Sequence, residues 1–336
     1  MKGIRNRVSP QVLILLGVIV LVVLLFSIMS PGYLSPKNIS NILLQASATT
    51  IAAAGMTLVI TAGWIDLSVG SVINFSMVVA LAASGVRSAS SGDSNAGTYF
   101  IVIGIALAAG AVNALLIQFL KVHPLLVTLG TLTLYRGLAL HFTNAGNWAA
   151  DGPIQALGRS QVLGIPGPVI TALVVVIAAD FVLRKTVLGR YIVAIGGSER
   201  SAHETALPIK RVRVAVYAIS ALCAGIAGII IVGRIGTLQS SLGEGYEFTV
   251  ITAVIVGGTS LFGGKGSVVG AALGAVLLVL IDNGLNRVDA SIYIYDVVRG
   301  AVLVAAVLLD SSVTERLRRL QEKRQHRKAR EAAAAT

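Results

Sequence analysis

Charged side chains are scarce in this 336-residue sequence. Asp, Glu, Lys and Arg make up 12% of it and hydrophobic residues 55%. A soluble globular domain carries roughly 25% charged residues, so half of the expected charge is missing. This deficit excludes an ordinary water-soluble domain and favours a chain that folds in a lipid bilayer. The 36 glycines suit the close approach of helices in such an environment.

Cysteine is nearly absent as well. The single cysteine, Cys223, lies inside an apolar segment. It cannot form an intrachain disulfide, and we expect it to act as a small buried hydrophobic residue.

Motifs for catalysis, phosphate binding and metal binding are also missing. The nearest approach to a phosphate-binding loop, Thr259 to Gly266, lacks the first Gly and the Ser/Thr that a P-loop needs. The four histidines are scattered without the spacing of metal ligands, and no G-x-S-x-G elbow occurs. We therefore expect no enzymatic activity, no metal and no cofactor in this chain, so any energy that it uses must come from a partner.

Long apolar segments dominate what is present. A hydrocarbon core of roughly 30 Å requires about 20 apolar residues per helix. The first segment, 11–29, is too long for a typical signal-peptide core, so we interpret it as a retained helix. The sequence predicts an all-α, polytopic bundle of about ten transmembrane helices at residues 11–29, 42–62, 69–86, 98–119, 124–141, 167–183, 213–232, 247–262, 267–285 and 292–310.

The basic residues set the orientation of this bundle. Of the 27 Lys and Arg residues, 20 fall on the side of the two termini and five on the other. By the positive-inside rule both termini are cytoplasmic. The sequence thus divides into a cytoplasmic N-terminus (1–10), a transmembrane permease domain (11–310) with a long cytoplasmic loop (184–213), and a basic cytoplasmic tail (311–336). The net charge of +12 therefore indicates contact with membrane lipids, not nucleic acid.

Three motif segments identify a family. They are 55–71 (GMTLVITAGWIDLSVGS), 194–202 (AIGGSERSA), and the set formed by 243–248 (GEGYEF), 256–267 (VGGTSLFGGKGS) and 282–286 (DNGLN). Together they resemble the permease subunit of the ribose-type bacterial ABC importers, from about Leu34 to Asp310.

The resemblance implies a location, a mechanism and partners. The location is the bacterial cytoplasmic (inner) membrane, which a multi-pass chain would cross. Two permease subunits, identical or paired with a sister, would form the pathway for a monosaccharide such as ribose or xylose. A separate cytoplasmic ATPase would use ATP, and an extracytoplasmic solute-binding protein would deliver the sugar.

The loop 184–213 is too long for a simple helix connection. Ser198 can cap a short helix that runs through Ala206, and Pro208 would end it. In the family this position holds the helix that couples to the ATPase, although Ala206 stands where the family usually has Gly; a merely solvated loop is the alternative. The coupling candidates are Gly196, Gly197, Ser198, Glu199, Arg200, Ala202 and Glu204.

Polar residues inside the predicted spans are candidates for the solute pathway, because burying them in a bilayer is costly. Hydrogen bonding between helices is the alternative role for each. We also expect Asp296 and Arg299, three residues apart on one helix face, to pair with each other or across a dimer. The pathway candidates are Asn74, Asn113, Asn283 and Glu247.

Other motif residues are expected to be structural. Asp66 can cap the helix that follows it by accepting N–H groups of Ser68 or Val69. The glycines beside it allow tight turns and close packing. The structural set is Gly63, Asp66, Ser68, Gly70, Gly257, Gly258, Gly263 and Gly264.

Two alternatives to sugar import by an ABC mechanism remain at this point. The same mechanism could carry a nucleoside, a branched-chain amino acid, a sugar alcohol or an autoinducer. An ion-coupled carrier would instead need a buried acidic residue that binds the coupling ion. Asp282 is the best candidate for that role, with Asp296 second if Arg299 does not neutralise it.

Overall fold

The computed structural model describes residues 10–87 and 94–309, so most of the predicted N-terminal segment and the whole basic tail lie outside the described residues. In this part the chain forms helices joined by short loops and four two-residue strands. The helices are α1 (Pro10–Met29), α2 (Pro36–Thr61), α3 (Val69–Ala83), α4 (Gly97–Leu120), α5 (Pro124–Thr143), α6 (Pro153–Arg159), α7 (Gly167–Lys185), α8 (Val187–Gly197), α9 (Glu199–Glu204), α10 (Ile209–Ile235), α11 (Tyr246–Val256), α12 (Val268–Arg287) and α13 (Ile292–Leu309). The strands are β1 (Trp148–Ala149), β2 (Gln161–Val162), β3 (Ile165–Pro166) and β4 (Thr237–Leu238), paired antiparallel as β1–β4 and β2–β3.

Several helices begin where the sequence supplies a side-chain cap. The Ser35 hydroxyl accepts the Asn38 N–H at the start of α2, and Pro36 occupies the first turn. The Ser267 hydroxyl accepts the Gly270 N–H at the start of α12, at 3.0 Å. These bonds satisfy backbone N–H groups that have no partner within the helix.

Seven helices of the described part are long and apolar enough to cross a membrane, namely α1, α2, α4, α5, α7, α10 and α12. Side chains on α1, α4, α5 and α7 expose large apolar groups, among them Leu21, Phe100, Leu126 and Phe181. In water such a surface would be unfavourable. The fold is therefore that of a multi-pass helical membrane protein.

Two of the predicted spans are shorter as helices than the sequence indicated. α3 has 15 residues and α11 has 11, which at 1.5 Å per residue gives only about 22 and 16 Å, less than a bilayer core of roughly 30 Å. α11 ends because Gly257 lies against the backbone of Gly270 in α12 and Gly258 takes a φ of +88°. The predicted helix at 247–262 therefore stops at Val256.

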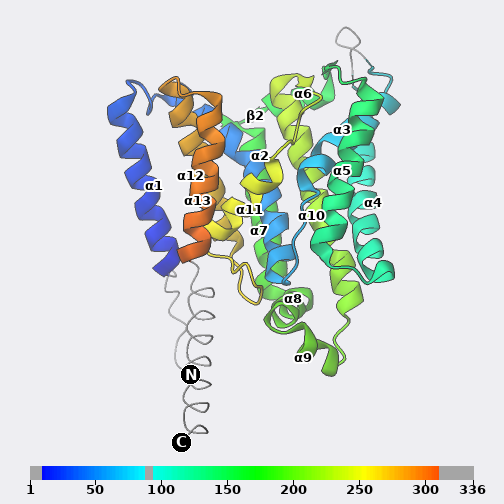
Figure 1. The fold of residues 1–336 in the computed structure, drawn as a ribbon. Helices are drawn as coiled ribbons and strands as arrows, with labels where there is room; N and C mark the ends of the chain where they lie inside the picture. Colours follow the sequence, from blue (N-terminus) through cyan, green and yellow to red (C-terminus); the bar gives the residue numbers. More distant parts are fainter. Residues whose placement is uncertain (1–9, 88–93, 310–336) are drawn as a thin grey trace, which may run out of the picture.

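The helices pack around α2. Figure 1 shows α1, α12 and α13 on one side of the molecule, α3, α4 and α5 on the other, and α2, α7 and α11 between them. α2 contacts α7, α10, α11 and α12. Helix α6 lies at one end of the bundle and α8 and α9 at the other, where α1 begins and α13 ends (Figure 1).

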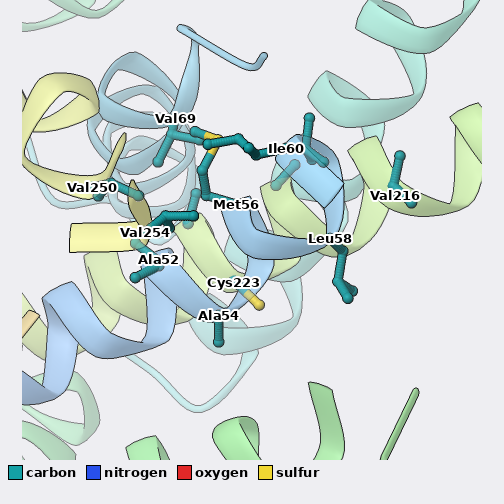
Figure 2. Packing of buried hydrophobic residues seen from close by; sticks show 14 of the residues in the cluster. Ala52, Ala54, Met56, Leu58, Ile60, Val69, Val216, Cys223, Val250 and Val254 are labelled. Atoms are coloured by element: carbon teal, nitrogen blue, oxygen red, sulfur yellow. The ribbon is translucent and has the colours of Figure 1, made fainter. Parts of the chain in front are cut away.

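Small side chains make α2 the centre of the core. Every residue from Ala46 to Thr61 is buried, and Figure 2 shows Val69 and Val254 close to Met56 of this helix. A Cβ at Gly55 would come within 2.8 Å of the Cys223 Cβ, so α2 and α10 can approach this closely only because residue 55 is glycine. Cys223 is buried and unpaired, which confirms its predicted role as a small apolar residue.

Candidate functional site

Parts of the motif segments that carry the family resemblance, from 55–71, 194–202 and 256–267, meet at one end of the bundle. We call the meeting point of Gly63, Gly196, Gly263 and Gly264 the glycine junction. There the Gly264 N–H donates to the Thr61 carbonyl at 2.9 Å. A Cβ on Gly196 would overlap that same carbonyl oxygen and lie 2.5 Å from the Gly264 nitrogen. The loops after α2 and α11 are thus packed backbone to backbone against the end of α8.

Helix α9 projects from this junction as predicted for a capped short helix. The Ser198 hydroxyl accepts the Ser201 N–H at 3.2 Å. The helix ends at Glu204, two residues before the predicted end at Ala206, because Ala206 takes a φ of +56°. That left-handed conformation favours glycine, the residue that the family usually has there.

Most of the α9 surface is free to contact a partner. The side chain of Arg200 is 90% exposed and that of Glu204 63% exposed, with 3.2 Å between their charged groups. Exposed pairs of this kind add little stability. Ala202 is the buried residue of α9 and packs into the core. The polar groups of α9 are therefore available for binding, whereas its apolar side attaches it to the bundle.

Glu199 connects α9 to the membrane domain. Its carboxylate accepts from Arg213 of α10 at 2.8 Å and from the Trp64 indole N–H at 3.4 Å. The Arg213 guanidinium lies 4.6 Å from the centre of the Trp64 ring, a cation–π geometry. We call Trp64, Glu199 and Arg213 the α9 anchor. Glu199 was predicted from the sequence as a coupling residue. Trp64 and Arg213 were not, because they lie far apart in the sequence.

Asp66 holds the start of α3, as predicted. One carboxylate oxygen accepts both the Ser68 N–H at 3.0 Å and the Ser68 hydroxyl at 2.6 Å; the other accepts the Ser220 hydroxyl at 3.2 Å. The Asn113 amide donates to the Ser68 hydroxyl at 2.7 Å. The expected hydrogen bond from the Ser68 N–H to Asp66 is present, and Asn113, a pathway candidate, lies against this loop.

The larger of two cavities lies between α2, α10, α11, α12 and α13. Its volume is about 200 Å³. The Thr49 and Tyr246 hydroxyls are hydrogen-bonded at 2.9 Å on its wall, and Asp282 pairs with Arg299 at 2.7 Å. The residues around it are Leu44, Gln45, Ala48, Thr49, Ile230, Ile231, Arg234, Leu242, Glu244, Tyr246, Thr249, Val279, Asp282 and Arg299.

Arg299 has a nearer partner than the one predicted. It lies 3.7 Å from the exposed Asp296 but makes two bonds to Asp282, at 2.7 and 3.3 Å. The predicted pair with Asp296 is present, yet Asp282 is the main partner. The charge of the Asp282 carboxylate is neutralised by its contact with Arg299.

A smaller cavity of about 20 Å³ brings together two predicted pathway residues, Asn74 and Glu247. This volume holds about one water molecule. The Asn74 amide donates to the Ser240 carbonyl at 2.9 Å, while its own oxygen is buried without a partner in the structure. Arg136 and Glu244 form an ion pair of 2.5 Å on its wall.

Asn283, the remaining pathway candidate, is placed elsewhere. It exchanges hydrogen bonds with Asn38 of α2 at 2.9 and 3.2 Å and is not among the residues that line the two cavities. Several residues of the larger cavity were not predicted from the sequence. Among them, Gln45 and Thr49 lie four residues apart and therefore on one face of α2, a spacing that could have indicated them.

Comparisons with known proteins agree with the motif segments. A family model described as "Branched-chain amino acid transport system / permease component" matches residues 38–307. The chain is 37% identical over 315 residues to the ribose import permease protein RbsC of Bacillus subtilis (strain 168), covering 92% of this chain and 94% of the relative. It is 36% identical to RbsC of Escherichia coli (strain K12), covering 88% and 92%, and 34% identical to the D-allose transport system permease protein AlsC of the same strain, covering 89% and 91%. No solved structure matches the chain.

Proposed function

Because this chain belongs to the family of branched-chain amino acid transport system permease components, we propose that it is the permease subunit of an ABC importer for a monosaccharide. The observation that carries the proposal is the full-length similarity to permeases named for ribose and D-allose import. The chain forms the membrane pathway in the bacterial inner membrane. ATP is hydrolysed by a partner, since this sequence has no phosphate-binding loop.

Helix α9 is the contact for that ATPase. Its exposed charges, its capped start and its attachment through Glu199 support this assignment. The coupling set is that of the predicted loop, from Gly196 to Glu204. Of these, Gly196 positions α8 against the glycine junction, whereas Arg200 and Glu204 present charges to the partner.

The cytoplasmic side is the end of the bundle that holds α8 and α9. In Figure 1 the start of α1 and the end of α13 lie at this same end. The Lys and Arg residues of the sequence concentrate there as well. We assign both termini to the cytoplasm, with ten membrane-embedded helices of which α3 and α11 cross only part of the bilayer. A second permease subunit, identical or a sister chain, completes the importer.

The alternatives have less support. An ion-coupled carrier would need a free acidic group in the membrane, but Asp282 is bound by Arg299. Branched-chain amino acid cargo fits the family description, yet the relatives described above are named for sugars. No relative named above points to a nucleoside.

Isolation of the chain with its partners tests the proposal. The complex would be purified in mild detergent from its native membranes and reconstituted in liposomes with its binding protein, and uptake of radiolabelled D-ribose and D-allose measured with and without ATP. We expect ATP-dependent uptake and recovery of a double-cassette ATPase. A variant with Gly/Ser in place of residues 199–204 should lose the ATPase, whereas the same replacement of the exposed residues 161–164, in the β2–β3 turn, should retain it. Uptake driven by an ion gradient alone, without any ATPase, would overturn the proposal.

A further inference from the structure

The larger cavity has the size of one sugar ring. An apolar cavity of about 150 Å³ holds a benzene molecule, so the volume of about 200 Å³ accommodates a single monosaccharide. Its walls come from five helices of one chain.

One side of the cavity offers hydrogen-bonding groups. Arg234 of α10 and Gln45 of α2 line it. Neither has a hydrogen bond or an ion pair to any described residue, although both side chains are partly buried. The bonded hydroxyls of Thr49 and Tyr246 lie on the same wall and have lone pairs left to accept. A ligand with several hydroxyl groups would satisfy these donors and acceptors.

Another part of the wall is apolar. Ala48, Ile230 and Val279 contribute aliphatic groups. A monosaccharide ring has hydroxyl groups at its edge and C–H groups on its faces, so it can use both surfaces together. Ligand sites commonly combine an apolar lining with a few polar groups that set orientation.

The charges of the cavity disfavour a cation. Asp282 and Arg299 neutralise each other, and Glu244 pairs with Arg136. Arg234 is then the one cationic group of the lining without a paired carboxylate among the described residues. It needs an acceptor such as a hydroxyl oxygen.

From these observations, and resting on the proposed function, we propose that the cavity between α2, α10, α11, α12 and α13 is a binding chamber for one monosaccharide on the pathway of the importer. Arg234 and Gln45 donate hydrogen bonds to the solute hydroxyls. Thr49 and Tyr246 complete the polar wall, and the Asp282–Arg299 pair joins α12 to α13 at its edge.

Cysteine labelling tests this assignment. Because Cys223 is the only cysteine, Cys223→Ala gives a cysteine-free chain. Into it are placed Thr49→Cys or Thr249→Cys, both in the cavity lining, and the control Thr252→Cys, which is buried on α11 outside the lining. The assembled complex in liposomes is treated with the small neutral reagent methyl methanethiosulfonate, with or without binding protein loaded with D-ribose or D-allose.

We expect the two cavity cysteines to react and the transported sugar to slow their reaction at least threefold, while the control stays unmodified. If the wild-type complex imports a sugar but the cavity cysteines do not react, or react equally with and without it, the chamber is wrong and the proposed function stands. If L-leucine, and not a sugar, slows the reaction of the cavity cysteines, the assignment of a monosaccharide as the ligand is wrong. If the wild-type complex imports neither sugar, the proposed function itself fails.

Uptake by an arginine variant gives an independent measure. Arg234→Met should lower sugar uptake at least tenfold, and Arg234→Gln, which keeps a donor, should lower it less. The matched control is Arg159→Gln, whose side chain is exposed and is not among the residues that line the cavity; it should transport normally. If all three variants take up the sugar equally well, the cavity is not the binding chamber for it.

Discussion

The glycine junction makes a sharp prediction, because two adjacent glycines at the end of α8 differ completely in their surroundings. A Cβ on Gly196 would overlap the Thr61 carbonyl and approach the Gly264 nitrogen to 2.5 Å, whereas a Cβ on Gly197 would meet nothing within 4 Å. Gly196→Ala and Gly197→Ala therefore add the same methyl group to the same helix with opposite consequences.

The size of the effect follows from two opposing terms. Replacing Gly by Ala in a helix stabilises it by roughly 1 kcal/mol in the interior and less at an end. Overpacking a tight site costs about 1–3 kcal/mol, and at Gly196 the obstacle on both sides is backbone that cannot change rotamer. We expect Gly197→Ala to be neutral or slightly stabilising and Gly196→Ala to be destabilising by about 2–3 kcal/mol.

Thermal unfolding of the permease in nanodiscs measures the difference. For a chain of this order of size, each kcal/mol lowers Tm by about 2–4 °C, so Gly196→Ala should melt about 4–12 °C below Gly197→Ala. ATPase stimulation by solute-loaded binding protein should fall in the first variant and persist in the second, since α8 carries α9. Equal Tm values and equal stimulation would show that the junction is not packed as described.

Three further predictions follow from other contacts. Ala206→Gly should raise the free energy of unfolding by about 0.5–1 kcal/mol, because it removes the strain of a left-handed alanine; a lower Tm would contradict this. Asp66→Ala should lower the free energy of unfolding by about 3 kcal/mol because three donors lose their acceptor. Asp66→Asn keeps one oxygen and should lower it by less than half of that amount; Tm measurements on both variants test this. A double-mutant cycle with Glu199→Gln and Arg213→Gln should give a coupling energy of about 1 kcal/mol that shrinks in high salt, and a value of zero would remove the ion pair from the α9 anchor.

The sequence was sufficient to predict the long helices, because length and hydropathy decide whether a segment can cross a bilayer. It predicted the starts of α3 and α11 to within one residue but not their ends. α11 ends where Gly257 lies against the backbone of Gly270 in α12. Local hydropathy carries no information about that contact.

The candidate site likewise contains features that follow from the local sequence and contacts that do not. The cap at Ser198 and the role of Asp66 follow from local spacing, and both were predicted. Arg234 lies just beyond the predicted helix 213–232, so the sequence places it in a loop. In the structure it belongs to the last turn of α10 and lines the larger cavity. Asn283 was expected to meet the solute, but Asn38, 245 residues away in the sequence, occupies its amide. Such pairings depend on the packing of helices that no short motif records.

The loop between α2 and α3 joins the α9 anchor to the interior of the bundle. Trp64 contacts Glu199 on one side, and the next residue, Ile65, offers its carbonyl to the Tyr217 hydroxyl at 3.1 Å. Asp66 then fixes the first turn of α3. A displacement of α9 is therefore applied to the start of α3 through three consecutive residues, each held by a specific contact.

Helix α3 in turn supports the wall of both cavities. Its Gly70 lies against the backbone of Gly243, and its Asn74 donates to the Ser240 carbonyl at 2.9 Å. The segment held by these contacts includes Leu242, which lines the smaller and the larger cavity alike. Because a close-packed interior transmits displacement instead of absorbing it, we expect that a movement of α9 would reach this segment. A short α3 suits that role, since a helix that begins inside the bundle can be pushed at its end, whereas one that crosses the whole membrane is held at both interfaces.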